Sequence, residues 1–188
     1  MKKHYSLVLT NLNAVSPGKN LPREINVVIE IPKGSSIKYE INPESGIIYV
    51  DRKLSASMIY PGNYGFVPQT KTDDGDPVDV LILDSGEPLM PSCVIGVRPI
   101  GVLLTEDQDG TDSKIIAVPA KDEEFSDIHD IKDITKSARK QIEHFFKHHK
   151  ELEKGKFIKI MGWREKETAM GIISEAAAKY SAEMKEGR

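Results

Sequence analysis

The chain lacks most of the features that mark secreted, membrane-spanning or nucleic-acid-binding proteins. Its single cysteine, Cys93, excludes a disulfide within the chain, and we expect a reducing, cytoplasmic location. No apolar run approaches the roughly 20 residues that a membrane-spanning helix needs. The first residues contain two lysines and a little apolar character, but charged and amide residues return too soon for a signal peptide. Lysines and arginines number 26 against 29 aspartates and glutamates, so the basic footprint of a nucleic-acid-binding protein is absent.

The length and composition suit one domain. The 188 residues, 39% of them hydrophobic, can bury one sizeable core, and neither a repeat nor a low-complexity tract divides them. We expect a single domain over residues 1–188, with an N-terminal arm over about 1–24 and a frayed, solvated tail over about 183–188.

Short apolar segments bounded by turn residues predict a series of strands. The expected strands cover residues 25–31, 37–41, 46–52, 78–83, 93–104, 114–118 and 157–161. Aromatic residues between proline and glycine predict a packed irregular segment over 58–69. Amphipathic patterns predict one helix over 135–152, with Thr135 as its N-cap, and another over 165–182. Strands first and helices later favour a β-barrel or curled sheet with helices packed outside.

The most informative stretch is residues 73–83, where four aspartates within seven residues open an apolar, β-branched run. Asp74, Asp76 and Asp79 lie at the mouth of the expected strand. Carboxylates this close resist ionising together unless a cation lies between them, and their oxygens suit Mg²⁺, Mn²⁺ or Ca²⁺. The stretch therefore indicates either a metal site or a solvated Asp-Gly-Pro turn.

A second acidic turn, residues 105–114, precedes the strand expected at 114–118. Neither turn is an EF-hand loop, because the sixth residue, which should be glycine, is Asp79 counted from Asp74 and Asp112 counted from Asp107. Two such loops at strand ends can converge at one rim and hold several ions. Other segments expected to face this rim carry basic and phenolic side chains, and each base lies near a strand or helix end. These side chains are Lys38, Arg52, Lys114, Lys150, Tyr60 and Tyr64. Together they suit a phosphate-rich substrate, although each base taken singly is better explained as a surface residue.

These blocks resemble the soluble family I inorganic pyrophosphatases in their shorter bacterial form. The family signature stands here as Asp-Gly-Asp-Pro-Val-Asp-Val at residues 74–80. Further similar blocks, in the same order as in the family, lie at 27–32, 60–66, 112–119 and 144–163. The resemblance runs from about residue 15 to 165, which is most of the chain.

The resemblance implies a mainly β fold with α: a five-stranded OB-like β-barrel with two main helices packed outside. It also implies an inorganic diphosphatase, which hydrolyses pyrophosphate to two phosphates by a metal-activated water. Several Mg²⁺ ions per active site are expected as cofactors, with Mn²⁺ or other divalent ions as alternatives. The expected partners are the pyrophosphate substrate and further copies of the chain in a homohexamer, with no nucleic acid and no membrane.

The resemblance also implies a role for each site residue. The metal ligands would be Asp74, Asp79, Asp112, Asp107 and Glu30. The general base would be Asp76. The residues that grip the phosphoryl groups would be Lys38, Arg52, Tyr64, Lys114 and Lys150, with Glu40 and Tyr60 in support. His149 stands where relatives usually have tyrosine. We expect it to line the pocket, to donate a hydrogen bond to phosphate and to weaken binding as the pH rises through its pKa.

Two other function classes fit parts of the sequence. A non-enzymatic OB-like module would bind single strands or oligosaccharides, but it needs a basic groove with stacking aromatics, whereas this chain concentrates carboxylates. Another metal-dependent phosphohydrolase would act on nucleotides or phosphomonoesters, yet neither a base-binding aromatic cleft nor a dinucleotide glycine motif is evident. Pyrophosphate hydrolysis is the interpretation that accounts for most of the sequence motifs described above.

Overall fold

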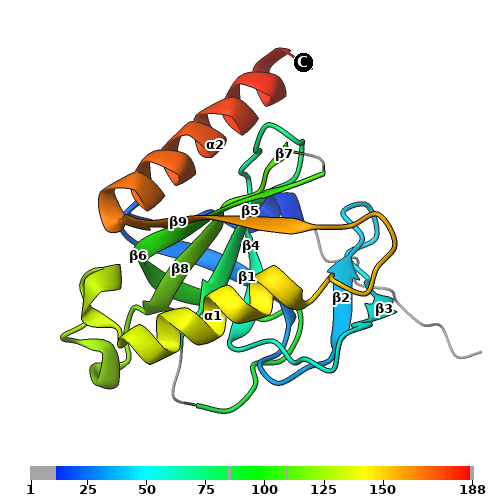
Figure 1. Ribbon diagram of the computed structural model, residues 1–188. Helices are drawn as coiled ribbons and strands as arrows, with labels where there is room; N and C mark the ends of the chain where they lie inside the picture. The colour runs from blue at the N-terminus through cyan, green and yellow to red at the C-terminus, as the bar shows by residue number, and fades with distance from the viewer. Residues whose placement is uncertain (1–11, 84–85, 109, 187–188) are drawn as a thin grey trace, which may run out of the picture.

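Five strands close into a barrel at the centre of the protein. The computed structural model describes residues 12–83, 86–108 and 110–186. The ring consists of β1 (Ile25–Ile31), β4 (Asn63–Val67), β5 (Val78–Ile82), β8 (Lys114–Pro119) and β6 (Val94–Asp107). Because β1 pairs with β4 on one side and with β6 on the other, the ring is closed (Figure 1). The predicted five-stranded barrel is confirmed.

The order of strands brings the two acidic loops to one rim. β5 and β8 run parallel, whereas the other neighbours in the ring are antiparallel. The parallel register pairs Val80 with Ile115, so both strands begin at the same end of the barrel. Each acidic loop leads into one of these two strands. β7 (Gly110–Thr111) and β9 (Ile158–Glu165) extend the sheet by pairing with β6.

The two long helices pack against different sets of strand residues. α1 (Lys136–His148) and α2 (Lys166–Glu186) lie on different sides of β9 (Figure 1). Since side chains alternate along a strand, Val80 and Ile82 pack in a cluster with Ile173 of α2, whereas Leu81 packs with Phe146 of α1. Both faces of β5 are therefore buried, which explains its continuous apolar sequence. Short 3₁₀ helices span Leu12–Ala14, Glu123–Phe125 and Ile131–Asp133.

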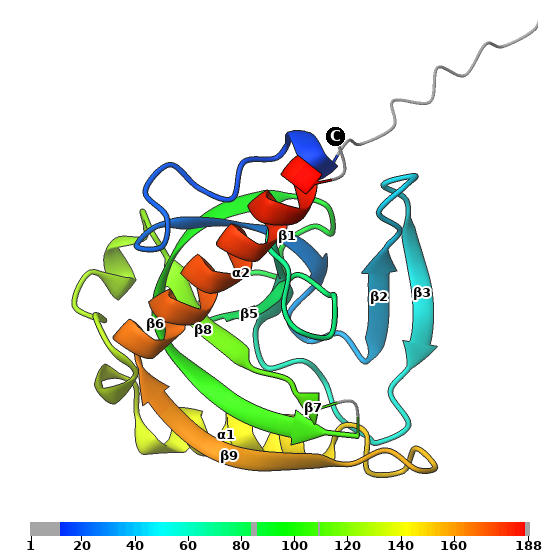
Figure 2. The same ribbon diagram turned by 90° about the horizontal axis from the view of Figure 1, so that it is seen from above.

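The hairpin β2 (Ile37–Ile41) and β3 (Ile48–Lys53) forms a separate two-stranded sheet beside the barrel (Figure 2). Its turn is organised by Asn42, whose Oδ1 accepts the backbone N–H groups of Glu44 and Ser45 at 3.1 and 2.8 Å. This hairpin was predicted. Among the described residues, no helix is both long and apolar enough to span a membrane.

The prediction of an irregular segment over 58–69 was wrong, because Asn63–Val67 is strand β4, buried along its whole length. Its close approach to β1 requires glycine: a Cβ on Gly65 would lie 1.9 Å from the carbonyl oxygen of Val28. The glycine that indicated a break in regular structure instead lets two strands of the ring come together.

Both predicted helices exist, but their ends differ from the prediction. Thr135 caps α1 by accepting the N–H of Ala138 at 3.1 Å, as expected, although the helix already ends at His148. α2 continues to Glu186, so most of the tail that was expected to be frayed is helical. Glu183 in this part pairs with Lys71 at 2.6 Å. The final two residues and the first eleven of the predicted arm lie outside the described residues.

Candidate active site

A buried lysine joins the two acidic loops. The register of β5 and β8 places Asp79 beside Lys114, whose Nζ lies 2.5 Å from Asp79 Oδ2 and also contacts the carboxylate of Asp112. Only 6% of Lys114 is exposed. Burial would lower the pKa of Lys114, but Asp79 and Asp112 outweigh burial and raise this pKa above its usual value. The ammonium therefore stays charged between two carboxylates from different loops.

The loops open onto a cavity of about 1180 Å³ at this rim. Of the fourteen residues predicted for the site, thirteen line it: Glu30, Lys38, Glu40, Tyr60, Tyr64, Asp74, Asp76, Asp79, Asp107, Asp112, Lys114, His149 and Lys150. Arg52 is the exception. The barrel thus brings together groups that are spread over most of the chain.

The first acidic loop presents Asp74 and Asp76 to solvent, in the turn before β5. Partial desolvation raises the pKa of Asp76, and the charges of Asp74 and Asp79 raise it further. A carboxylate with a raised pKa is a stronger proton acceptor once it is ionised. The position and the pKa of Asp76 therefore suit a general base.

A half-buried carboxylate and two buried phenols line the cavity wall together with Asp79. Burial raises the pKa of Glu30 to about 7, and the charge of Asp79 contributes to this rise. The N–H of Ile41, which donates to Glu30 Oε1 at 2.9 Å, acts in the opposite direction and lowers the pKa. Burial and then the charge of Asp79 raise the pKa values of Tyr60 and Tyr64, so both phenols keep their protons and can donate hydrogen bonds. Full ionisation of Glu30 at neutral pH would be favoured by a cation beside it.

Arg52 lies just outside the cavity lining, across the hairpin from Lys38. It contacts Asp51, and its Nε donates to Glu153 Oε1 at 3.0 Å. Lys38 Nζ donates to Glu40 at 2.6 Å and lies 3.4 Å from Asp51. Carboxylates therefore hold both cations next to each other on the hairpin.

The second acidic loop meets the segment that follows α1. Lys150 Nζ donates to Asp107 Oδ2 at 3.3 Å, and the two side chains are only 19% and 9% exposed. The N–H of Asp112 donates to the carbonyl of Thr105 at 2.9 Å, which closes the loop. A base and two carboxylates are thus fixed on this side of the cavity.

His149 lines the cavity as expected, but its surroundings do not suit the expected donor to phosphate whose charge changes with pH. The ring is 6% exposed and stacks on Phe145 with centroids 4.9 Å apart. Its Nδ1 lies 3.2 and 3.1 Å from the carbonyl oxygens of Phe145 and Phe146, so Nδ1 carries the proton and Nε2 is an acceptor. Burial and then Lys150 lower the pKa of His149 to about 4. The imidazole is therefore neutral at physiological pH.

The donor set fits a divalent metal by its chemistry. In residues 12–83, 86–108 and 110–186, no group of three or more His, Cys, Asp or Glu side chains is gathered around one metal position. The oxygens of Asp79 and Asp112 nevertheless converge on one positive charge, the ammonium of Lys114. Carboxylate oxygens are the ligands that Mg²⁺ and similar hard cations prefer. These two carboxylates, with Asp74 and Glu30 on the same cavity, can therefore hold such an ion.

Helix α2 forms one wall of the cavity, which the sequence did not predict. Ile172, Glu175, Lys179 and Tyr180 line this wall, and Figure 2 shows α2 crossing above the barrel. The amphipathic pattern predicted a packed helix but did not place it at the site. The i, i+4 spacing of Glu175 and Lys179 was the available signal, because it places two polar groups on one helix face next to the apolar stripe.

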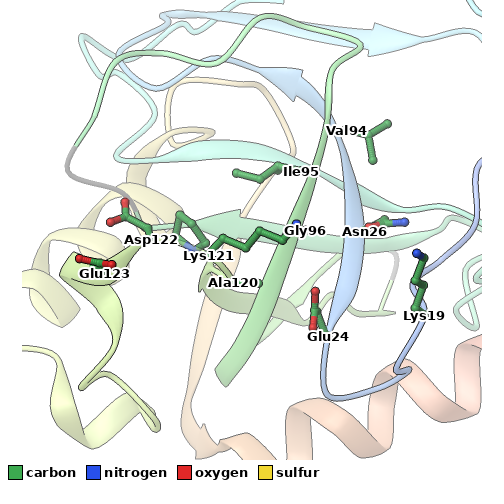
Figure 3. A pocket seen from close by; sticks show the side chains of 11 residues that line it. Lys19, Glu24, Asn26, Val94, Ile95, Gly96, Ala120, Lys121, Asp122 and Glu123 are labelled. Atoms are coloured by element: carbon green, nitrogen blue, oxygen red, sulfur yellow. The ribbon is translucent and has the colours of Figure 1, made fainter.

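A second hollow of about 690 Å³ lies at the opposite rim, where β1 and β6 begin and β8 ends. Figure 3 shows Lys19 and Lys121 in its lining together with Glu24, Asp122 and Glu123. None of the predicted site residues lines it, and its charges of both signs are not arranged around a buried group. The acidic rim is therefore the candidate site.

The comparisons with known proteins agree with this site. The family described as inorganic pyrophosphatase matches residues 27–181. An inorganic pyrophosphatase from Agrobacterium fabrum is 49% identical over 175 residues, which cover 92% of this chain and 98% of the relative.

Two solved structures share the fold. The crystal structure of inorganic pyrophosphatase from Thermus thermophilus has a TM-score of 0.88 and 42% identity, and the match covers 92% of this chain and 99% of that chain. A truncated vacuolar soluble pyrophosphatase from Trypanosoma cruzi, solved in complex with PPi, has a TM-score of 0.76 and 25% identity. That match covers 97% of this chain and 76% of the other.

Proposed function

Because this chain belongs to the inorganic pyrophosphatase family and is a hydrolase of that family, we propose that it cleaves inorganic pyrophosphate to two phosphates with Mg²⁺ as cofactor. The observation that carries the proposal is the Lys114 ammonium, held between Asp79 and Asp112 in a cavity that thirteen predicted site residues line. Pyrophosphate is highly charged, and this cavity combines carboxylates for cations with lysines for phosphate. The complex of the Trypanosoma cruzi relative with PPi supports the same substrate.

In this proposal the carboxylates divide between two groups of ions. Asp74, Asp79 and Asp112 would hold the first Mg²⁺, and Asp79 would also contribute to a second. Asp107, Asp112 and Glu30 would hold ions that arrive with the substrate. The convergence of Asp79 and Asp112 on one ammonium supports these assignments, since both carboxylates already face a cation, and Glu30 lies in the wall of the same cavity.

The remaining residues would act on the water and on the phosphoryl groups. Bound divalent ions would reverse the negative field of the cavity and acidify a water molecule. Asp76 would accept the proton from that water over a short distance. The phosphoryl oxygens and the leaving phosphate would be held by Lys38, Arg52, Tyr64, Lys114 and Lys150, with Glu40 and Tyr60 in support. Fixed positive charges and donors of this kind stabilise the charge that spreads over the transferring group.

Phosphate release tests the proposal. Purified protein is expected to release phosphate from pyrophosphate in the presence of Mg²⁺ and to stop when a chelator is added. Release from ATP or from a phosphomonoester under the same conditions should be much slower. Faster release from either of these would favour the broader phosphohydrolase, and no release from pyrophosphate would overturn the proposal.

The structure predicts that His149 introduces no pH dependence between pH 6 and 9. With a pKa of about 4, its imidazole stays neutral over this interval. The ratio of KM values for pyrophosphate between His149→Tyr and the unsubstituted protein should therefore be constant from pH 6 to pH 9 in steady-state phosphate-release assays. A ratio that rises or falls steadily across this interval would contradict the neutral ring.

We also propose a homohexamer, as the family resemblance implies. Exposed apolar side chains around the segment between α1 and β9 support a contact surface there: Leu152, Phe157 and Met161 are 68%, 50% and 47% exposed. Light scattering measures the mass in solution, and a monomer at every concentration would contradict the proposal. A cytoplasmic location stays a prediction from the single cysteine.

A further inference from the structure

Thr72 connects the residues of the first acidic loop to one another. Its N–H donates to the carbonyl of Asp76 at 2.8 Å, and its own carbonyl accepts the N–H of Gly75 at 3.3 Å. Its hydroxyl contacts the carboxylate of Asp74 and lies 2.7 Å from the carbonyl of Asp76. Asp74 Oδ1 also accepts the N–H of Asp76 at 3.1 Å. Thr72 therefore holds the carboxylate of Asp74 directly and the backbone of Asp76.

Helix α2 holds this loop from outside. Lys179 Nζ donates to the carbonyl of Thr72 at 2.8 Å and to Asp73 Oδ1 at 2.9 Å. The N–H of Lys71 donates to the carbonyl of Ala176 at 3.0 Å, so the chain is attached to the helix just before the loop begins. Lys179 is 107 residues away from Thr72 in the sequence. In Figure 2, α2 crosses above the barrel.

We propose that Thr72 and Lys179 are positioning residues, which together hold the loop 72–76 in the shape that presents Asp74 and Asp76 to Mg²⁺ and water. This inference rests on the proposed metal-dependent hydrolysis. Thr72 holds the carboxylate of Asp74 and the backbone of Asp76 inside the loop. Lys179 holds the carbonyl of Thr72 and the carboxylate of Asp73 from the helix. A loop that is ordered in advance loses less conformational entropy when it binds a metal, so both residues raise metal affinity without touching the metal.

The expected loss of Mg²⁺ affinity in each variant follows from the contacts that the substitution removes. Lys179→Met removes one exposed ion pair and one hydrogen bond to a carbonyl, and it should weaken Mg²⁺ binding about three- to fivefold. Thr72→Val keeps the β-branched shape but removes a hydroxyl that contacts a carboxylate, and it should weaken binding about tenfold. Because both residues hold the same loop, the double variant should lose less than the product of the two effects.

Titration calorimetry of Mg²⁺ into the substrate-free protein tests the proposal, alongside the Mg²⁺ dependence of phosphate release and thermal unfolding. Lys179→Arg and Thr72→Ser should restore most of the affinity. Lys185→Met, an exposed lysine on the last turn of the same helix, is the matched control and should bind Mg²⁺ normally.

Unchanged Mg²⁺ affinity in both Lys179→Met and Thr72→Val would overturn the proposal, whether or not the melting temperature falls. Calorimetry needs no turnover, so it separates this proposal from the function it rests on. Weakened Mg²⁺ binding in a protein that releases no phosphate would leave the positioning role intact while the hydrolytic function fails.

Discussion

Replacing Asp76 with asparagine is expected to lower the turnover of pyrophosphate by about two to four orders of magnitude, the contribution of a positioned general base. Asparagine keeps the shape of the side chain but cannot accept a proton. In the unsubstituted protein, desolvation and then Asp74 and Asp79 raise the pKa of Asp76, which increases its basicity. Since we assign Asp76 to neither phosphate nor metal, kcat should fall much more than KM rises in steady-state phosphate release.

A matched substitution shows whether this loss is specific. Asp127→Asn changes an exposed aspartate that does not line the active-site cavity, and it should leave turnover unchanged. The response of the Asp76→Asn variant to excess Mg²⁺ tests the assignment of Asp76 as the base. If excess Mg²⁺ restored full turnover to that variant, Asp76 would be a metal ligand and its assignment as the base would be wrong.

Lys114→Met is expected to destabilise the metal-free protein by about 2–3 kcal/mol, slightly less than the usual cost of removing one partner from a fully buried ion pair. The substitution removes the cation between Asp79 and Asp112, whose side chains remain 30% and 22% exposed. Mg²⁺ should restore much of the lost stability, because a cation again lies between the two carboxylates. Turnover should fall by about two to three orders of magnitude and stay low, since Mg²⁺ does not replace the donor to phosphate.

Denaturant unfolding with a chelator and with Mg²⁺ measures both parts of this expectation. Lys132→Met is the control: Lys132 is 70% exposed and lies 3.5 Å from Glu165, so its loss should change the free energy of unfolding by about 0.5 kcal/mol or less. An equal loss of stability with and without Mg²⁺ in Lys114→Met would mean that no ion binds between Asp79 and Asp112.

The residues of the site were predictable where the signal is local. The spacing of Asp74, Asp76 and Asp79 points to a cation because close carboxylates repel one another whatever the fold. The meeting of Asp79 with Asp112 was not derivable from either loop, because it depends on which strands become neighbours. The positions of the two loops at strand ends indicated that they can converge, but only the resemblance to a family placed Asp79 and Asp112 at one ion before the barrel was seen.

Other features depend on tertiary packing and could not be read from the sequence. The pKa of His149 follows from burial against Phe145 and from the carbonyls at the end of α1, neither of which is visible in the residue itself. Strand β4 was missed because Gly65 weakens a strand on average, and here it is required by the distance to Val28. The contact between Lys179 and Thr72 joins segments with no common pattern.

The parallel pairing of β5 and β8 makes the proposed catalytic centre depend on the register of these two strands. Val80 lies opposite Ile115, and Asp79 therefore meets Lys114. Since side chains alternate between the two faces of a strand, inserting or deleting one residue in β5 would turn Asp79 to the other face, even if every apolar residue found a buried place. The barrel could still form after such a shift, because its hydrophobic composition would be unchanged, but Asp79 would no longer meet Lys114. The length of β5 therefore determines the contact between Asp79 and Lys114 as well as the packing of the barrel.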